Sequence, residues 1–258
     1  MVCVSNDKDS IQSIARALDI LLLLHQEEKE MGVTQISSAL GMYKSTVCRT
    51  LATLENKGFV QQNPETGKYW MGLKLYSLGM QMRRKMPLQN IAAPLARTLS
   101  EKCNEVVHIA VLDPQAEQYP QQIIIDKFES QQVLSFTPGV GSVSACHGSA
   151  VGKCLLAFSD PQQLAEFEGM PLPAFTDKTI TDWTVLLGEL TAIRAKGFAV
   201  DDEELELGLT CIAAPIMGRD HIVAALSLSG PTSRLQGDLC NEIIQEVRKT
   251  AAAISALL

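Results

Sequence analysis

The sequence predicts an α+β protein made of two modules, a small helical front module and a larger rear module of strands and helices. Apolar residues recur at helical spacing over about the first sixty positions, and two short β-like runs around a Pro/Gly turn follow them. Charge divides in the same place, because residues 1–85 hold 11 Lys and Arg against 8 Asp and Glu, whereas the remainder holds 11 against 21. This asymmetry favours two modules that meet different partners.

The composition is that of a globular protein, with 46% hydrophobic and 20% charged residues. A pI near 5.2 argues against a protein that binds nucleic acid over most of its surface. The start has no basic leader followed by an apolar core, and no apolar run reaches the length of a membrane span, so we expect a cytoplasmic protein without membrane contact. Seven cysteines without a Cys-x-x-Cys pair indicate free thiols in a reducing compartment.

Three helices are predicted in the front module. Apolar residues at helical spacing between positions 11 and 22 predict the first. Thr34 is placed to cap a short second helix, and Gly41 permits a tight turn after it. The third begins near Tyr43 and ends at Lys57-Gly58, a basic last turn followed by glycine.

The second and third helices have the spacing of a helix-turn-helix. Small Ser37 is predicted where the helices approach closely, Gly41 lies in the turn, and Val47 fills the space between the helices. With Leu51 and Leu54 buried beside Val47, the opposite face of the third helix carries two cations and short polar side chains, which suits a DNA groove. Spacing alone is equally typical of a plain three-helix core.

A hairpin predicted after the third helix favours DNA binding over a plain three-helix core. The runs Phe59-Val60 and Lys68-Tyr-Trp-Met71 flank a Pro/Gly turn, which is the wing of a winged helix. The wing and the local positive charge favour DNA binding, with Lys68 reaching the backbone or a minor groove. The predicted DNA contacts are Thr34, Tyr43, Lys44, Ser45, Thr46, Cys48, Arg49, Thr53 and Lys68.

A connecting helix and then the rear module follow. Apolar residues lie on more than one face between positions 72 and 85, which predicts a linker helix that meets a partner chain, and Pro87 interrupts it. Helices are predicted at 91–103, 150–158, from Asp160-Pro161, at 182–196, and along a last helix lined by Leu239, Ile243, Val247 and Ile254. Strands are predicted at 106–112, 123–128, 133–136, 198–200, 211–217 and 222–229, with a hairpin turn at 218–221.

Catalysis and metal binding are weakly supported. Cys146 and His147 suggest a nucleophile and its base, but adjacent residues of a strand point to opposite faces. The run from Gly148 to Lys153 is one residue short of a phosphate-binding loop, and Cys154 replaces its hydroxyl. Cys146, His147 and Cys211 stay open as a zinc or thiol-redox sensor, although their spacing matches no common helical ligand pattern.

A small-molecule pocket fits the rear module better. Ser227 and Ser229 lie two apart on an apolar strand and therefore share a face, and Cys211 on the preceding strand can face the same hollow. The helix start at 148–152 offers backbone N–H groups to a carboxylate, and Asp201 can accept a hydrogen bond from a hydroxyl or amine.

The chain also resembles a known family over nearly its whole length. Ordered motifs carry the resemblance: Arg16-Ala-Leu-Asp-Ile-Leu, Lys44-Ser-Thr-Val-Cys-Arg-Thr-Leu, Tyr69-Trp-Met-Gly-Leu, Val107-His-Ile-Ala-Val-Leu-Asp, His147-Gly-Ser-Ala-Val-Gly-Lys, Asp201-Asp-Glu-Glu, Cys211-Ile-Ala-Ala-Pro and Ser227-Leu-Ser-Gly-Pro. These are similar to the isocitrate-lyase-regulator (IclR) family of bacterial transcription factors. The resemblance implies a winged-helix domain, a linker helix, and an effector-binding domain of GAF-like αβ fold.

The resemblance also implies boundaries, partners and pocket positions. We expect a flexible N-terminus at 1–9, a DNA-binding domain at 10–71, a linker at 72–88 and an effector-binding domain at 89–258. The implied partners are a double-stranded operator with an inverted repeat, a small carboxylate or aromatic acid, and a second copy in a homodimer or homotetramer, with no cofactor. The implied ligand positions are Val133, Phe136, Ser144, Ala150, Val151, Asp201, Leu209, Cys211, Ser227 and Ser229.

Overall fold

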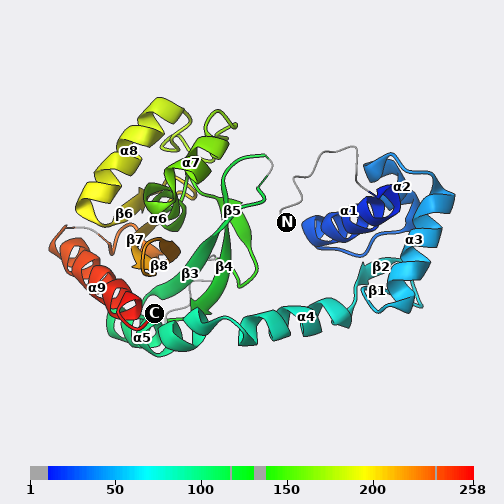
Figure 1. The fold of residues 1–258 in the computed structure, drawn as a ribbon, viewed down its shortest axis with the longest axis horizontal. Helices are drawn as coiled ribbons and strands as arrows, with labels where there is room; N and C mark the ends of the chain where they lie inside the picture. Colours follow the sequence, from blue (N-terminus) through cyan, green and yellow to red (C-terminus); the bar gives the residue numbers. More distant parts are fainter. Residues whose placement is uncertain (1–10, 117, 131–137, 236) are drawn as a thin grey trace. The chain divides into compact units, whose positions relative to one another are not determined.

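The chain folds into two compact units, Met1–Met86 (the front unit) and Pro87–Leu258 (the rear unit). The computed structural model describes residues 11–116, 118–130, 138–235 and 237–258. Figure 1 labels the helices and strands of each unit. The predicted strand at 133–136, together with Val133 and Phe136, falls outside the described residues.

The front unit is a three-helix core followed by a hairpin and a further helix (Figure 1). Its elements are α1 (Gln12–Glu27), α2 (Val33–Leu40), α3 (Lys44–Asn56), β1 (Val60–Gln62), β2 (Tyr69–Met71) and α4 (Leu73–Arg84). The predicted stripe of α3 is confirmed, since Val47, Leu51 and Leu54 are buried against Ile20 and Ile36. Helical spacing of apolar side chains thus builds the core that orients the other face of α3 outward.

The turn between α2 and α3 follows from Ser37 and Gly41. Gly41 adopts φ 62°, a left-handed conformation that glycine tolerates without strain. The Ser37 hydroxyl donates to the carbonyl of Met42 at 2.6 Å, so this small side chain closes the turn. The prediction that Thr34 caps α2 is wrong. The cap is Gly32, two residues earlier, and Gln35 accepts the N–H of Gly32 at 2.9 Å, as a glutamine at the third helical position does in a capping box.

The chain passes very close to itself where the wing ends and α4 begins. The Gly72 N–H donates to Phe59 O at 2.8 Å, and the Lys74 N–H donates to Gly58 O at 3.2 Å. A Cβ on Gly72 would lie 2.2 Å from Gly58 O, closer than any side chain can approach. Glycine is therefore required for the wing to join α3 and α4.

Helix α4 itself buries none of its residues. Leu73, Tyr76 and Met82 are each about two-thirds exposed or more (78%, 68% and 66%). Exposed apolar groups of this size on one helix mark a surface suited to a protein partner.

The rear unit is built on a six-stranded antiparallel sheet in the order β5-β4-β3-β8-β7-β6, which confirms the α+β class. The strands are β3 (Val106–Asp113), β4 (Gln121–Phe128), β5 (Val143–Ala145), β6 (Ala199–Asp202), β7 (Leu209–Met217) and β8 (Ile222–Pro231). The predicted hairpin at 218–221 is confirmed by the hydrogen bond from Gly218 N–H to His221 O.

In the part of this unit that the structure describes, five helices accompany the sheet: α5 (Pro87–Cys103), α6 (Ala150–Phe158), α7 (Pro161–Phe167), α8 (Trp183–Lys196) and α9 (Gly237–Ser255). Helix α6 packs against the central strands with α8 beside it, whereas α5 and α9 pack from the other side (Figure 1). Asp160 caps α7 as predicted, Asp182 caps α8 rather than beginning it, and Gly197 ends α8 with φ 77°. None of the helices in the described ranges combines the length and apolar character needed to cross a bilayer.

The sequence predictions for the rear unit missed one strand and misplaced one side chain. Strand β5 has only three residues and was not predicted, because so short a run carries no visible alternation. Leu239 was expected to line the core, yet it is 48% exposed, since it lies in the first turn of α9, whereas Ile243, Val247 and Ile254 are buried.

Gly72→Ala should destabilise the front unit by about 1–3 kcal/mol, because the added Cβ meets backbone that cannot shift freely. Urea unfolding followed by Trp70 fluorescence, in a chain carrying Trp183→Phe, measures this. Gly79→Ala is the matched control. A Cβ there meets nothing within 4 Å, so this change in exposed α4 should stabilise the helix by about 0.5–1 kcal/mol. Equal effects of the two substitutions would contradict the close approach at Gly72.

Candidate nucleic-acid interface and ligand site

The outward face of α3 carries positive charge and small polar groups. Lys44, Ser45, Cys48 and Arg49 are exposed, while the opposite face is buried in the front core. Thr53 is exposed as well, although its hydroxyl donates to the carbonyl of Arg49 at 2.9 Å and is partly used within the helix. A helix with one buried face and short side chains beside two cations can approach a major groove closely.

The other predicted contacts surround this face. Tyr43 is the residue preceding α3 and is 86% exposed, and Thr46 is half-buried. Thr34 lies exposed in the first turn of α2, and Lys68 is exposed just before β2, at the end of the wing turn. The fold thus leaves eight of the nine predicted side chains exposed to a partner, Thr46 being the half-buried one.

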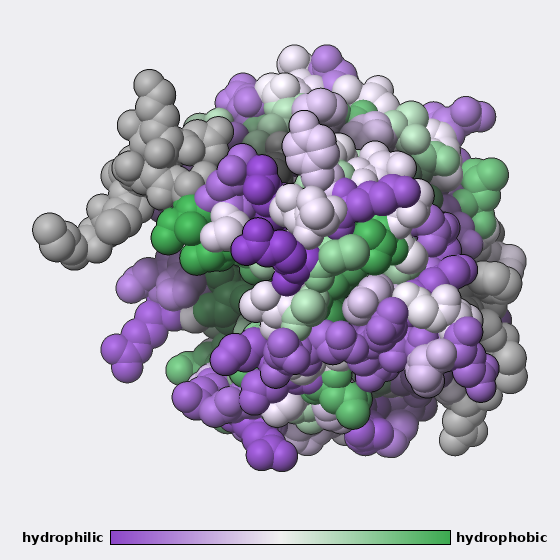
Figure 2. Space-filling model, turned by 90° about the vertical axis from the view of Figure 1, so that its right-hand side faces the viewer, coloured by the Kyte–Doolittle hydropathy of each residue, from purple (hydrophilic) through white to green (hydrophobic). Residues whose placement is uncertain are grey.

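A groove of about 630 Å³ runs between α1 and α3. Arg49 lines it together with Arg16 of α1, which is not among the DNA contacts predicted from the sequence. Ile14, Leu18 and Phe59 supply apolar walls. Figure 2 shows that hydrophilic residues cover most of the visible face, with apolar residues gathered in separate patches.

In the rear unit, strand register brings four predicted ligand residues onto one face of the sheet. Cys211 lies opposite Asp201 on one side and Ser229 on the other, which forms a row across three strands. Ser227 faces the same way, because it is two residues from Ser229. The two serines and Asp201 are 2%, 4% and 1% exposed, so their polar atoms are removed from bulk water.

The acid in this row is unusual for a carboxyl group. Burial, chiefly, and the neighbouring Glu204 carboxylate raise the pKa of Asp201 to about 7, against the opposing effects of the Glu204 N–H, Lys153 and Cys211. The Asp201 carboxylate accepts that N–H at 2.8 Å. Asp201 can therefore be neutral or charged near physiological pH, and can donate or accept a hydrogen bond.

His108 is a buried residue of this face that sequence reasoning missed. It lies directly opposite Ser227 across β3 and β8 and is 3% exposed. Burial, with a smaller effect of Lys127, lowers the pKa of His108 to about 4, so its ring is neutral at pH 7. Its Nε2 lies 3.2 Å from Pro138 O. A lone histidine within an apolar strand was the available signal, but only register connects it to the serines.

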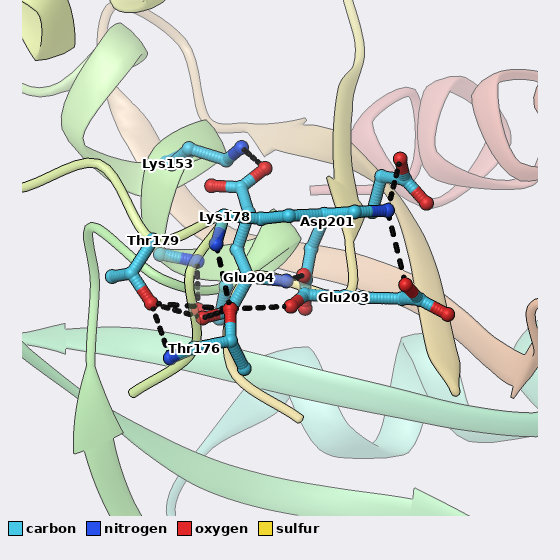
Figure 3. Close-up of polar contacts among 10 residues, drawn as sticks. Lys153, Thr176, Lys178, Thr179, Asp201, Glu203 and Glu204 are labelled. Carbon is cyan, nitrogen blue, oxygen red and sulfur yellow. Dashed lines mark hydrogen bonds and ion pairs between the residues drawn. The ribbon is translucent and has the colours of Figure 1, made fainter. Parts of the chain in front are cut away.

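A buried ion pair lies beside Asp201, at one end of the row (Figure 3). The Lys153 ammonium on α6 donates to Glu204 Oε1 at 2.5 Å, and Lys153 is 1% exposed. Figure 3 shows Thr176 and Thr179 directed at the carbonyl of Glu204, which accepts from both hydroxyls. The lysine of the phosphate-loop-like run therefore holds a carboxylate of its own chain.

Glycine allows the start of α6 to lie against the turn after β5. A Cβ on Gly152 would lie 2.2 Å from Cys146 Cα. Ser149 caps the helix and accepts the Gly152 N–H at 3.1 Å, and its hydroxyl donates to Gln122 at 2.9 Å. The predicted cradle of N–H groups at 148–152 thus needs correction at Gly152, whose N–H is already engaged.

The remaining predicted ligand positions do not all lie beside this row. Ala150 and Val151 are buried at the start of α6, and Leu209 shares a face with Cys211 on β7. Ser144 lies on β5, at the opposite edge of the sheet from Asp201, and its hydroxyl accepts from Gln122 at 3.0 Å. The sheet therefore does not bring Ser144 into the row.

The residues of the metal or thiol-sensing alternative have separate surroundings. Cys146 and His147 lie beyond the end of β5, in the turn before α6, rather than on a strand as expected. Burial raises the pKa of the Cys146 thiol well above its ordinary value, and His147 Nε2 lies 2.9 Å from Pro173 O. Burial likewise raises the pKa of Cys211, beside Asp201 and Ser229. Across the described ranges, no three His, Cys, Asp or Glu residues are grouped to hold a metal ion.

Comparison with known proteins places this geometry in a family. The model described as "Bacterial transcriptional regulator IclR C-terminal" matches residues 80–256, and the model "IclR helix-turn-helix domain" matches residues 13–64. The chain is 35% identical over 250 residues to the HTH-type transcriptional regulator KdgR of Escherichia coli K12, covering 96% of this chain and 93% of that protein.

Solved structures share the fold. An IclR-type regulator from Silicibacter sp. TM1040 has 27% identity and a TM-score of 0.82, with 95% of each chain covered. An IclR homologue from Microbacterium hydrocarbonoxydans, crystallised with 4-hydroxybenzoate, has 22% identity and a TM-score of 0.78, covering 95% of this chain and 98% of that one. The family models span most of the chain, and the named relatives are regulators rather than enzymes. The chain therefore belongs to the IclR family of DNA-binding transcriptional regulators.

Proposed function

We propose that this protein is a ligand-responsive repressor whose front unit binds an operator and whose rear unit binds a small organic acid. The exposed Lys44 and Arg49 on α3, beside a wing and opposite a buried face, carry the DNA-binding part of the proposal. Cations on such a helix can contact phosphates and guanine edges, and the short side chains between them permit close approach.

The operator is proposed to be an inverted repeat read by two copies of the chain. A two-fold dimer presents two identical helices to two half-sites, so the symmetry of the protein is repeated in the DNA. The exposed apolar residues of α4 support association of copies, either as a dimer or as a tetramer.

The effector is proposed to be a small carboxylate or aromatic acid held beside the row of Asp201, Cys211 and Ser229. Buried hydroxyls and a carboxyl group on an otherwise apolar face are what a specific small-molecule site needs. Ser227 and Ser229 can donate to a ligand oxygen, and Asp201 can meet a ligand hydroxyl. The 4-hydroxybenzoate held by the similar chain combines these two groups in one molecule and supports this class.

Ligand and DNA are coupled in this proposal through the geometry of the assembled copies. An effector that binds one arrangement more tightly shifts the population toward it, and with it the half-site spacing that the two α3 helices can span. We take release of the operator by the effector as the direction of control.

Selection of genomic DNA fragments by the purified protein, at moderate salt, tests the DNA-binding part. Recovery of one inverted repeat is the expected result, and the genes beside it identify acids to test in the rear unit. Recovery of fragments without any common sequence would contradict operator recognition.

Arg49→Ala should weaken operator binding by about tenfold to a hundredfold, because a cation contact to a base or phosphate is worth about 1–3 kcal/mol. Fluorescence anisotropy with the selected duplex measures the affinity. Arg219→Ala, which removes an exposed arginine from the rear unit, is the matched control and should bind like the unaltered chain. Undiminished affinity of Arg49→Ala would remove this residue from the interface.

Ser227→Ala combined with Ser229→Ala should abolish the response to the effector and spare operator affinity, because the two hydroxyls lie in the rear unit. Titration of the protein–operator complex with 4-hydroxybenzoate and a panel of small organic acids measures the response. A normal response in the double variant would place the ligand elsewhere.

Asp201→Asn should flatten the pH dependence of stability. The folded-state pKa of about 7 exceeds the ordinary 3.8, so the stabilising effect of the bound proton is full below about pH 4 and is lost as the pH rises through 7. Over that window the unaltered chain should lose up to about 1.4 kcal/mol per pH unit from this group. Urea unfolding at several pH values compares the two chains. An unchanged slope in Asp201→Asn would contradict the raised pKa.

A further inference from the structure

The wing is defined here as residues 60–71, and its tip as the turn between β1 and β2. Glu30, just before α2, binds this tip. Its carboxylate accepts from the Asn63 side-chain amide at 2.8 Å and from the Thr66 hydroxyl at 2.9 Å. These partners are 33 and 36 residues away in sequence. The next residue, Met31, exchanges two backbone hydrogen bonds with Tyr69, at 3.0 and 2.8 Å. The segment before α2 is therefore attached to strand β2 and to the turn of the wing.

The two side chains that Glu30 holds are those that shape the turn. Asn63 Oδ1 accepts the N–H of Glu65 at 2.9 Å. The Thr66 hydroxyl oxygen accepts the N–H of Lys68 at 3.3 Å, and the Lys68 carbonyl accepts the N–H of Asn63 at 2.8 Å. A continuous set of hydrogen bonds thus runs from the Glu30 carboxylate to the backbone of Lys68.

The carboxylate is in its charged form in this arrangement. The hydrogen bonds from Asn63, chiefly, and Thr66 lower the pKa of Glu30 below its ordinary value, and nearby Lys68 lowers it further. Hydrogen bonds to an ionised acceptor are stronger than neutral ones. An acid beside a DNA-binding cation is otherwise unfavourable, because it repels phosphate.

We propose that Glu30 is a positioning residue for DNA binding, whose carboxylate fixes the wing tip so that Lys68 is presented to the sugar–phosphate backbone. This inference rests on the proposed operator binding by the front unit. Glu30 touches no DNA in this role and acts through Asn63 and Thr66.

The sign of the effect of Glu30→Ala on affinity tests the proposal. Removal of a negative charge near DNA should by electrostatics alone tighten binding. Loss of the wing anchor should instead weaken it by about threefold to tenfold, the worth of about one contact. Glu65→Ala is the matched control, since Glu65 is an exposed acid of the same turn that uses only its backbone N–H in these hydrogen bonds. It should bind equally or more tightly.

The probe is a fluorescein-labelled random-sequence duplex at low salt, followed by the selected operator, both measured by anisotropy. A double-mutant cycle with Lys68→Ala identifies the route, because Glu30→Ala should then cost less than about twofold. A mere loss of global stability would not produce this coupling, nor lower the salt dependence of binding as loss of one phosphate contact does.

Three results would overturn the role of Glu30: affinity of Glu30→Ala equal to or above that of the unaltered chain, a full loss that persists with Lys68→Ala, or an equal loss in Glu65→Ala. If the unaltered chain bound neither duplex, the proposed DNA binding itself would be refuted together with the role of Glu30. That outcome is distinct, because it does not involve any variant.

Discussion

The close approach of Gly152 to Cys146 is the constraint on which the organisation of the rear unit depends. With no side chain at Gly152, the start of α6 lies against the backbone after β5, and no other residue leaves that space. Three side chains of this helix segment then act at fixed positions. Ser149 reaches Gln122 on β4, Lys153 reaches Glu204 beyond β6, and Cys154 fills the core between them. One helix thereby connects strands near both edges of the sheet.

The buried polar groups of the rear unit change along the row from a charged pair at one end to neutral groups at the other. At one end Lys153 neutralises Glu204, whose other carboxylate oxygen has no hydrogen-bond partner among the described residues. Asp201 follows, and then come neutral hydroxyls and a neutral imidazole at His108. Burial of so many polar atoms is costly unless they are paired. Hydrogen bonds and the ion pair offset this cost at Asp201, His108 and Lys153, and the face that these groups share is the one proposed to hold the effector.

Local patterns were sufficient to predict much of the fold. The buried stripe of α3, the start of α7 at Asp160-Pro161 and the glycine turn after α2 all depend on residues a few positions apart. Ser227 and Ser229 could be assigned to one face for the same reason, because alternation along a strand is a local property.

What the sequence could not predict depends on contacts between distant residues. Lys153 and Glu204 are 51 positions apart, and Ser227 meets His108 only through the pairing of β3 with β8. The cap of α2 was assigned to Thr34 because threonine is a common capping residue, but the helix begins at Val33, so Thr34 lies inside its first turn. Ser144 was grouped with the pocket by resemblance, whereas strand order separates it from Asp201 by the width of the sheet.

The bare surface of α4 has a consequence for the dose response of gene control. A helix of 12 residues that buries none of them is marginal in water, since short helices gain most of their stability from packing. In the proposed assembly, a second copy of the chain would supply the apolar contacts that stabilise it. The stiffness of α4 would then increase with the concentration of the protein. Cellular abundance would thus set the sharpness of the switch as well as the number of operators occupied.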